Sequence, residues 1–159
     1  MIDWPQWVLD GFLATVVLTL IEALARGFGF TRMNLPFILG TIFSGNRDRA
    51  RLIGLGVHLL VGWIFALPYF FVFLSLNLPT WWFGALLGLG HGLFIMAALM
   101  PVMPAMHPRM ADETHGPTPT RQLQPPGFLA LNYGRRTFVF AILAHIVYGA
   151  ILGGLASLQ

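Results

Sequence analysis

The feature that most constrains this chain is a run of 57 residues, 52–108, that contains no Asp, Glu, Lys or Arg. Soluble domains carry roughly a quarter charged residues, whereas this chain has 9% charged and 57% hydrophobic residues. A membrane-spanning helix needs about 20 predominantly apolar residues, so the run can hold two spans and the turn between them. The sequence therefore predicts that the lipid bilayer is the solvent of this protein.

Two further apolar segments flank this run. One lies between Asp10 and Arg26 and is interrupted only by Glu22, and the other is uncharged from Thr137 onwards. The pattern predicts an all-α, polytopic membrane protein with a single transmembrane domain over residues 1–159. We expect transmembrane helices at about 8–29, 52–76, 81–100 and 137–157, a short turn at 77–80, and longer loops at about 30–51 and 101–136.

The distribution of basic residues predicts the orientation of the spans. All nine basic residues are arginines, and they flank or lie in the two longer loops, whereas Asp3 and Asp10 lie towards the other side. Because basic residues concentrate in cytoplasmic loops, we expect both long loops to be cytoplasmic and the N-terminus and C-terminus to be outside. The pI of about 10.2 then reflects membrane orientation, and we expect no nucleic-acid partner.

The two longer loops resemble each other. LPFILGTIFSGNRDRAR in the first and PPGFLALNYGRR in the second each combine proline, a short apolar segment, glycine and arginines. The helices that follow contain HLLVG (58–62) and HIVYG (145–149). We interpret the chain as two similar helical hairpins that form an internal repeat. The apolar segments 35–43 and 127–133 are too short to span, so we expect short interfacial helices there.

Small residues recur along the expected spans at helical spacing. In lipid, such residues allow helix backbones to approach closely, because packing replaces the hydrophobic effect as the driving force. The pattern predicts close helix packing and gives no indication of catalysis. The residues expected at helix contacts are Gly11, Thr15, Thr19, Gly54, Gly62, Gly84, Gly88, Gly92, Gly149 and Gly153.

Each expected span also carries one ionisable side chain roughly 9–14 Å from its cytoplasmic end, at a rise of ~1.5 Å per residue. These residues are Glu22, His58, His91 and His145. Ionisable groups inside a membrane are costly and are functional candidates by default. The histidines could hydrogen-bond neighbouring helices, or bind haem b as cofactor ligands. All four residues could instead hold a metal ion or relay protons. The sequence leaves these alternatives open.

Several motifs give the chain a resemblance to known proteins. They are Gly11 with ATVV (14–17), LPFILGTIF followed by RDRAR, HLLVGWIFA, WWFGALLGLGHG and HIVYGAILG. With these motifs the chain resembles small four-helix bacterial inner-membrane proteins of unknown function, of the YagU-like type. The resemblance implies a four-helix topology and a location in the bacterial inner (cytoplasmic) membrane. It implies no activity and no catalytic residues.

The small-residue stripes favour a non-enzymatic accessory or assembly subunit that packs against other membrane-protein subunits or forms a homo-oligomer. The sequence contains no cysteine and no lysine, which excludes catalytic thiols and Schiff-base chemistry, and no recognisable catalytic motif is present. The alternatives are a redox module that binds haem b or a metal ion through His58, His91 and His145, and a small proton-linked transporter. We therefore expect the protein not to be an enzyme.

Overall fold

The computed structural model describes residues 4–112 and 114–158. Asp3, one of the two aspartates used to predict the orientation, lies outside the described residues. The contacts divide the chain into two compact units. Unit 1 comprises residues 1–24, 59–92 and 140–159, and unit 2 comprises residues 25–58 and 93–139. All nine arginines belong to unit 2.

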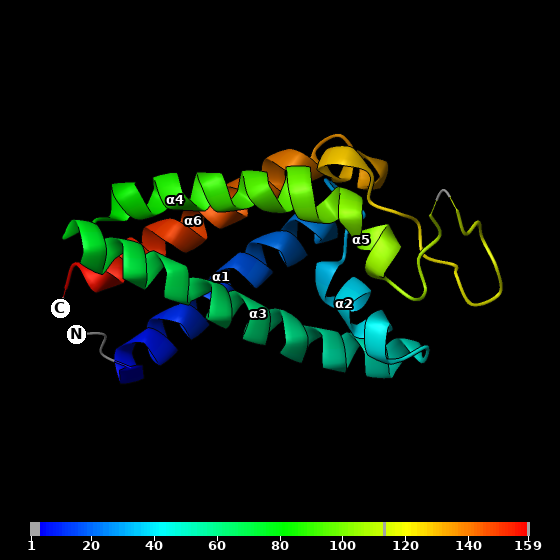
Figure 1. The fold of residues 1–159 in the computed structure, drawn as a ribbon, viewed down its shortest axis with the longest axis horizontal. Coiled ribbons are helices and arrows are strands. Elements are labelled where there is room, and N and C mark those ends of the chain that lie inside the picture. The colour runs from blue at the N-terminus through cyan, green and yellow to red at the C-terminus, as the bar shows by residue number, and fades with distance from the viewer. Residues whose placement is uncertain (1–3, 113, 159) are drawn as a thin grey trace. The chain divides into compact units, whose positions relative to one another are not determined.

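The described part of the chain is helical, with four segments long and apolar enough to cross a membrane. This confirms the prediction of a helical protein with four candidate spans. The spans are α1 (Trp4–Gly27), α3 (Arg47–Leu76), the continuous helical segment Trp81–Met106, and α6 (Thr137–Ala156). Figure 1 shows these long helices together with the shorter helix α2 (Leu35–Phe43).

Helix α3 begins at Arg47, five residues before the expected start at Leu52. The side chain of Asn46 accepts hydrogen bonds from the backbone N–H groups of Asp48 and Arg49, at 3.1 and 3.0 Å. Such a cap satisfies donors that the first turn of a helix leaves without partners, and Asp48 in that turn favours the helix dipole. The charged sequence RDRAR, expected in a loop, is therefore the first turn of the helix.

The third span extends past its expected end at residue 100. It consists of α4 (Trp81–Phe94), the π-helical turn η1 (Ile95–Leu99) and α5 (Met100–Met106). Pro101 has no backbone N–H and its ring crowds the carbonyl one turn earlier, which disturbs an α-helix. The wider π turn, in which the Met100 N–H bonds to the Ile95 carbonyl, accommodates that proline without ending the helix.

In unit 1, small residues bring pairs of helices into close contact. Gly84 of α4 lies against Gly149 of α6, and Thr15 of α1 lies against Gly62 of α3. Figure 1 shows α4 (green) beside α6 (orange to red). The start of α1, the end of α6 and the turn between α3 and α4 lie at the same end of this unit. The buried core contains Ala14, Leu18, Ala66, Tyr69, Phe70, Phe73, Ala144, Tyr148 and Leu152.

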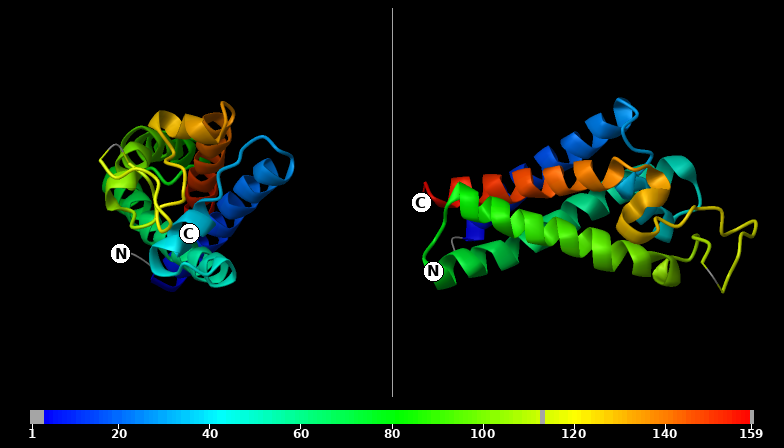
Figure 2. Two further views of the ribbon diagram at one scale, coloured as in Figure 1. Left: turned by 90° about the vertical axis from the view of Figure 1, so that its right-hand side faces the viewer. Right: turned by 90° about the horizontal axis from the view of Figure 1, so that it is seen from above.

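Unit 2 contains the two segments that the repeat hypothesis equates, and their local structures differ. Residues 35–43 form the α-helix α2, in which Gly40 packs against the backbone of α3 at Ala50. Residues 128–133 form a 3₁₀ segment, η2 (Phe128–Tyr133), in which Leu129 and Ala130 have φ angles of 54° and 55°. Figure 2 shows the long loop (yellow) that joins α5 to η2. The internal repeat stays a prediction.

Candidate functional site

Polar side chains from three of the spans meet in unit 1. It consists of Tyr69 of α3, His91 of α4, and His145 and Tyr148 of α6, here called the His–Tyr cluster. The rings of His91 and His145 meet edge to face, with centroids 4.8 Å apart and planes at 83°. Phe65 also stacks on the His91 ring, with centroids 4.6 Å apart and planes at 28°. Two of the sequence-predicted histidines are therefore direct neighbours.

Hydrogen bonds connect this cluster to three helices. The Tyr69 hydroxyl and His91 Nδ1 share a hydrogen bond of 3.1 Å. His145 Nδ1 lies 2.8 Å from the Ala141 carbonyl, so Nδ1 carries the proton and donates it, since a carbonyl only accepts. The Tyr148 hydroxyl donates to the Gly62 carbonyl of α3 at 2.6 Å. The buried Nε2 of His91 has no hydrogen-bond partner among the described residues.

The geometry of the two histidines bears on the haem and metal hypotheses. Axial ligation of one haem iron by His91 and His145 would place the porphyrin between the rings, whereas here the rings touch each other. Haem binding by this pair would therefore require α4 and α6 to separate. Among residues 4–112 and 114–158, no three His, Asp or Glu side chains are grouped closely enough to hold a metal ion.

The other two predicted ligands, His58 and Glu22, are buried side chains of α3 and α1. His58 is 6% exposed and belongs to α3 in unit 2, one turn after Gly54, which packs against the backbone of α2 at Pro36. Glu22 is 8% exposed and belongs to α1 in unit 1. The structure thus shows His91 and His145 in contact, and the four-residue metal site stays a prediction.

Most glycines of the predicted stripes face another helix of the same chain. A Cβ atom on Gly88 would collide with the His145 carbonyl, and a Cβ on Gly92 would lie 3.1 Å from the Cβ of His145. A Cβ on Gly11 would lie 2.8 Å from the ring of Trp63. Gly153 makes a similarly close approach to Thr80. Gly88 and Gly92 thus allow α4 to approach α6 closely at His145, where the His–Tyr cluster forms.

Of the five glycines that have open space around an added Cβ atom, two lie in the interior of a span and face away from the described chain, whereas Gly27 ends α1 and Gly29 and Gly116 lie in loops. A Cβ on Gly56 of α3 or on Gly90 of α4 would meet no described atom within 4 Å beyond its own helical surroundings. Gly90 follows Trp82 and Leu86 on one exposed face of α4. Glycine inside a helix costs about 0.5–1 kcal/mol relative to alanine. Packing within the described chain gives no reason for this cost at either position.

His107 and Arg109, which the sequence analysis did not select, hold α2 in unit 2. His107 Nε2 lies 2.9 Å from the Ile38 carbonyl, and His107 Nδ1 accepts from the Arg109 backbone N–H at 3.1 Å. Burial lowers the pKa of His107, against the opposing effect of its hydrogen bond to Ile38. The Arg109 Nη1 donates to the carbonyls of Thr41 and Ile42. A cation at the C-terminus of a helix also interacts favourably with its dipole.

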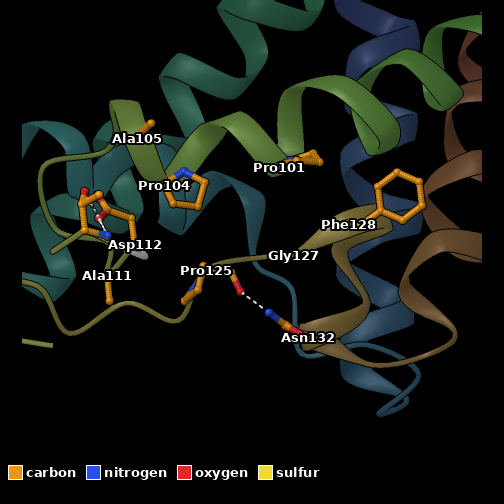
Figure 3. A pocket seen from close by; sticks show the side chains of 10 residues that line it. Pro101, Pro104, Ala105, Ala111, Asp112, Pro125, Gly127, Phe128 and Asn132 are labelled. Carbon is orange, nitrogen blue, oxygen red and sulfur yellow. Dashed lines mark hydrogen bonds between the residues drawn. The ribbon is translucent and has the colours of Figure 1, made fainter. Parts of the chain in front are cut away.

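Unit 2 contains two pockets of similar size. The first, of about 670 Å³, is bounded by the prolines and Phe128 shown in Figure 3. Its polar groups already have partners: Asn132 donates to the Pro125 carbonyl at 3.0 Å, and Thr114 donates to Asp112. The hydrogen bond from the Thr114 hydroxyl is the largest influence that lowers the pKa of Asp112 to about 2. The surface that this pocket leaves free for a ligand is therefore mainly apolar.

The second pocket, of about 610 Å³, combines arginines with apolar side chains. Its lining residues include Arg47, the first residue of α3, and Arg109, which donates a hydrogen bond to the last turn of α2. Phe37, Leu123 and Pro119 form the apolar part of the wall.

Comparison of the chain with models of known protein families, with curated proteins and with solved structures gives no match.

Proposed function

We propose that this integral membrane protein is a non-enzymatic accessory or assembly subunit that packs in the bilayer against another membrane protein or a second copy of itself. The four apolar spans make the membrane its environment. The arginines of unit 2 orient it with its long loops in the cytoplasm and both termini outside, in a bacterial inner membrane as the YagU-like resemblance implies.

The observation that carries this proposal is the pair of outward-facing glycines, Gly56 and Gly90. The inward-facing glycines are explained by contacts inside the chain, whereas these two leave the surface of a span open. Helices associate in lipid through close packing at small residues. An exposed glycine beside large side chains such as Leu86 provides the space that a helix from another subunit would fill.

The hydrogen bonds of the His–Tyr cluster fit the same role. Tyr148 joins α6 to α3, and Tyr69 joins α3 to α4. Polar contacts between spans are worth about 0.6 kcal/mol on average and up to about 2 kcal/mol. The cluster thus stiffens the group of helices in unit 1 to which the outward-facing Gly90 belongs.

The proposal is tested by the size of the complex extracted in mild detergent or in native-lipid nanodiscs. We expect a species larger than one chain, and Gly90→Leu should reduce it to a folded monomer because the added side chain fills the open surface. Leu143→Phe is the matched control, since it adds bulk to an exposed position of α6 that has no glycine beside it. A wild-type protein that is a monomer in both media would contradict the proposal.

A second candidate function, a metal- or haem b-binding redox module, is favoured by one observation. Two imidazoles from different spans are in contact, and the buried Nε2 of His91 has no described partner. Imidazole nitrogen suits Zn, Cu and Fe. A dithionite-reduced minus oxidised absorption spectrum and a metal analysis test it, with His91→Phe as the variant that should lose the signal. A folded preparation without metal or haem would exclude this function.

A further inference from the structure

The arginine pocket of unit 2 is the second pocket described above, lined by Arg47 and Arg109. Unit 2 contains nine arginines against three acidic residues, an excess of six positive charges. Within the described residues, Asp48 pairs with Arg51 and Asp112 pairs with Arg121. Neither Arg47 nor Arg109 has a carboxylate partner there. Two guanidinium groups therefore line one cavity without a counter-charge from the described chain.

The orientation of Arg109 leaves one edge of its guanidinium group available. Nη1 is the nitrogen that donates to the carbonyls of Thr41 and Ile42. Nε and Nη2 face Gly45, where a Cβ atom would lie 3.4 and 3.7 Å from them. No hydrogen bond of these two nitrogens occurs in the described part of the chain. Two parallel N–H groups of this kind bind carboxylate or phosphate oxygens in a bidentate manner.

The position of the pocket along α3 places it at the level of lipid headgroups. Arg47 precedes the first residue of the uncharged run, Leu52, by five residues, which is about 7.5 Å along a helix. The interfacial layer on each side of the hydrocarbon core is roughly 5–8 Å thick. A phosphate group beside Arg47 would therefore lie at headgroup depth if Leu52 enters the hydrocarbon.

The remaining wall of the pocket suits an amphipathic anion. Phe37, Pro119 and Leu123 provide apolar surface in the same pocket. Phosphate oxygens satisfy the paired donors of an arginine, and a glycerol backbone with the start of an acyl chain suits the apolar wall. The volume of about 610 Å³ falls within the range of roughly 300–1,000 Å³ usual for small-molecule sites.

From these features we propose that the arginine pocket binds the phosphate group of an anionic phospholipid headgroup through Arg47 and the Nε–Nη2 edge of Arg109. Soluble phosphate shares this chemistry, and the experiment separates the two sources. The proposal goes beyond the accessory role and does not depend on it, since it concerns lipid and not a protein partner.

The test uses the full chain in detergent with dihexanoylphosphatidylglycerol as the anionic probe, followed by isothermal titration calorimetry. Measurements at 0.5 M NaCl reduce general surface attraction, because the screening length is then between about 3 and 8 Å. We expect saturable binding that Arg47→Gln weakens about tenfold or more, as for the loss of one charge-assisted hydrogen bond. Dihexanoylphosphatidylcholine should bind at least tenfold more weakly.

Two variants distinguish the pocket from general charge. Arg49→Gln removes the same charge from the same end of α3 at a residue that does not line the pocket, and it should change the affinity less than twofold. Gly45→Val keeps both arginines but covers the free edge of Arg109, and it should weaken binding about tenfold. Arg109 itself is avoided as a test residue because its Nη1 holds the end of α2.

Inorganic phosphate identifies the source of the phosphate group. If it fails to displace the short-chain lipid at millimolar concentration, the site recognises a lipid headgroup. If it binds with equal affinity and the same response to Arg47→Gln, the phosphate site stands and its ligand is soluble. Absence of binding by both probes, equal binding of phosphatidylcholine, or equal loss in Arg47→Gln and Arg49→Gln would overturn the proposal.

Discussion

Substitution of Gly84 by alanine should destabilise the bundle, whereas the same substitution at Gly90 of the same helix should stabilise it. A Cβ on Gly84 would collide with the Gly149 carbonyl and lie 2.9 Å from its carbon and 3.1 Å from the Gly153 nitrogen. Carbon atoms prefer separations of about 3.5–4.0 Å. These obstacles belong to the backbone of α6, so no side-chain rotation can relieve them, and α4 must move away from α6.

The expected changes in the free energy of unfolding have opposite signs at Gly84 and Gly90. Overpacking typically costs about 1–3 kcal/mol, so Gly84→Ala should lower the free energy of unfolding by about that amount. At Gly90 nothing described lies within 4 Å, so Gly90→Ala should raise it by about 0.5–1 kcal/mol through helix propensity. Unfolding of the isolated protein by SDS in mixed micelles, followed by circular dichroism, measures both values. A shift in the same direction for both variants would refute the packing argument.

Three further predictions concern single side chains. Because burial lowers the pKa of His107 from its usual 6.5, the unfolded state binds more protons below that pH, and stability should fall as the pH drops below about 6.5. His107→Gln should reduce the change in the free energy of unfolding between pH 7.5 and 5.5. An equal change in the wild type and the variant would contradict this prediction. Tyr148→Phe should lower the free energy of unfolding by about 0.5–1.5 kcal/mol through loss of the hydrogen bond to Gly62; an unaltered SDS midpoint would exclude a contribution of that bond. Asp112→Asn should speed tryptic cleavage after Arg121, because Asp112 accepts bonds from Thr114, His115 and Arg121. The exposed Asp48→Asn is its control, and equal rates in both variants would count against a structural role for Asp112.

The four spans were predictable because long uncharged runs decide which segments can enter lipid, wherever the helices finally pack. The boundaries of the spans depended on local hydrogen bonds and helix geometry, which are harder to predict from the sequence. Asn46 extends α3 backwards as a cap, and a π turn carries the third span past Pro101. Proline usually interrupts helices, so the continuation required geometry that residue spacing does not reveal.

The candidate sites depended more strongly on tertiary structure. Spacing along α4 selects the stripe of Gly84, Gly88 and Gly92, but only the position of α6 distinguishes this inward face from the outward-facing Gly90. The contact between His91 and His145 joins residues far apart in sequence. His107 and Arg109 lie in the segment expected to be a loop, and their hydrogen bonds to α2 arise only from the folding of unit 2.

The most direct test of the proposed role is photo-crosslinking in native membranes from position 86. The chain contains no cysteine, so Leu86→Cys can be labelled selectively with a benzophenone maleimide one turn from Gly90. We expect a defined protein adduct, either a dimer of this chain or a complex with another membrane protein, that disappears when Gly90→Leu is added. Leu20→Cys, an exposed position on α1, should give only lipid labelling. Equal adduct yields from positions 86 and 20, or no adduct from position 86, would contradict packing through this face.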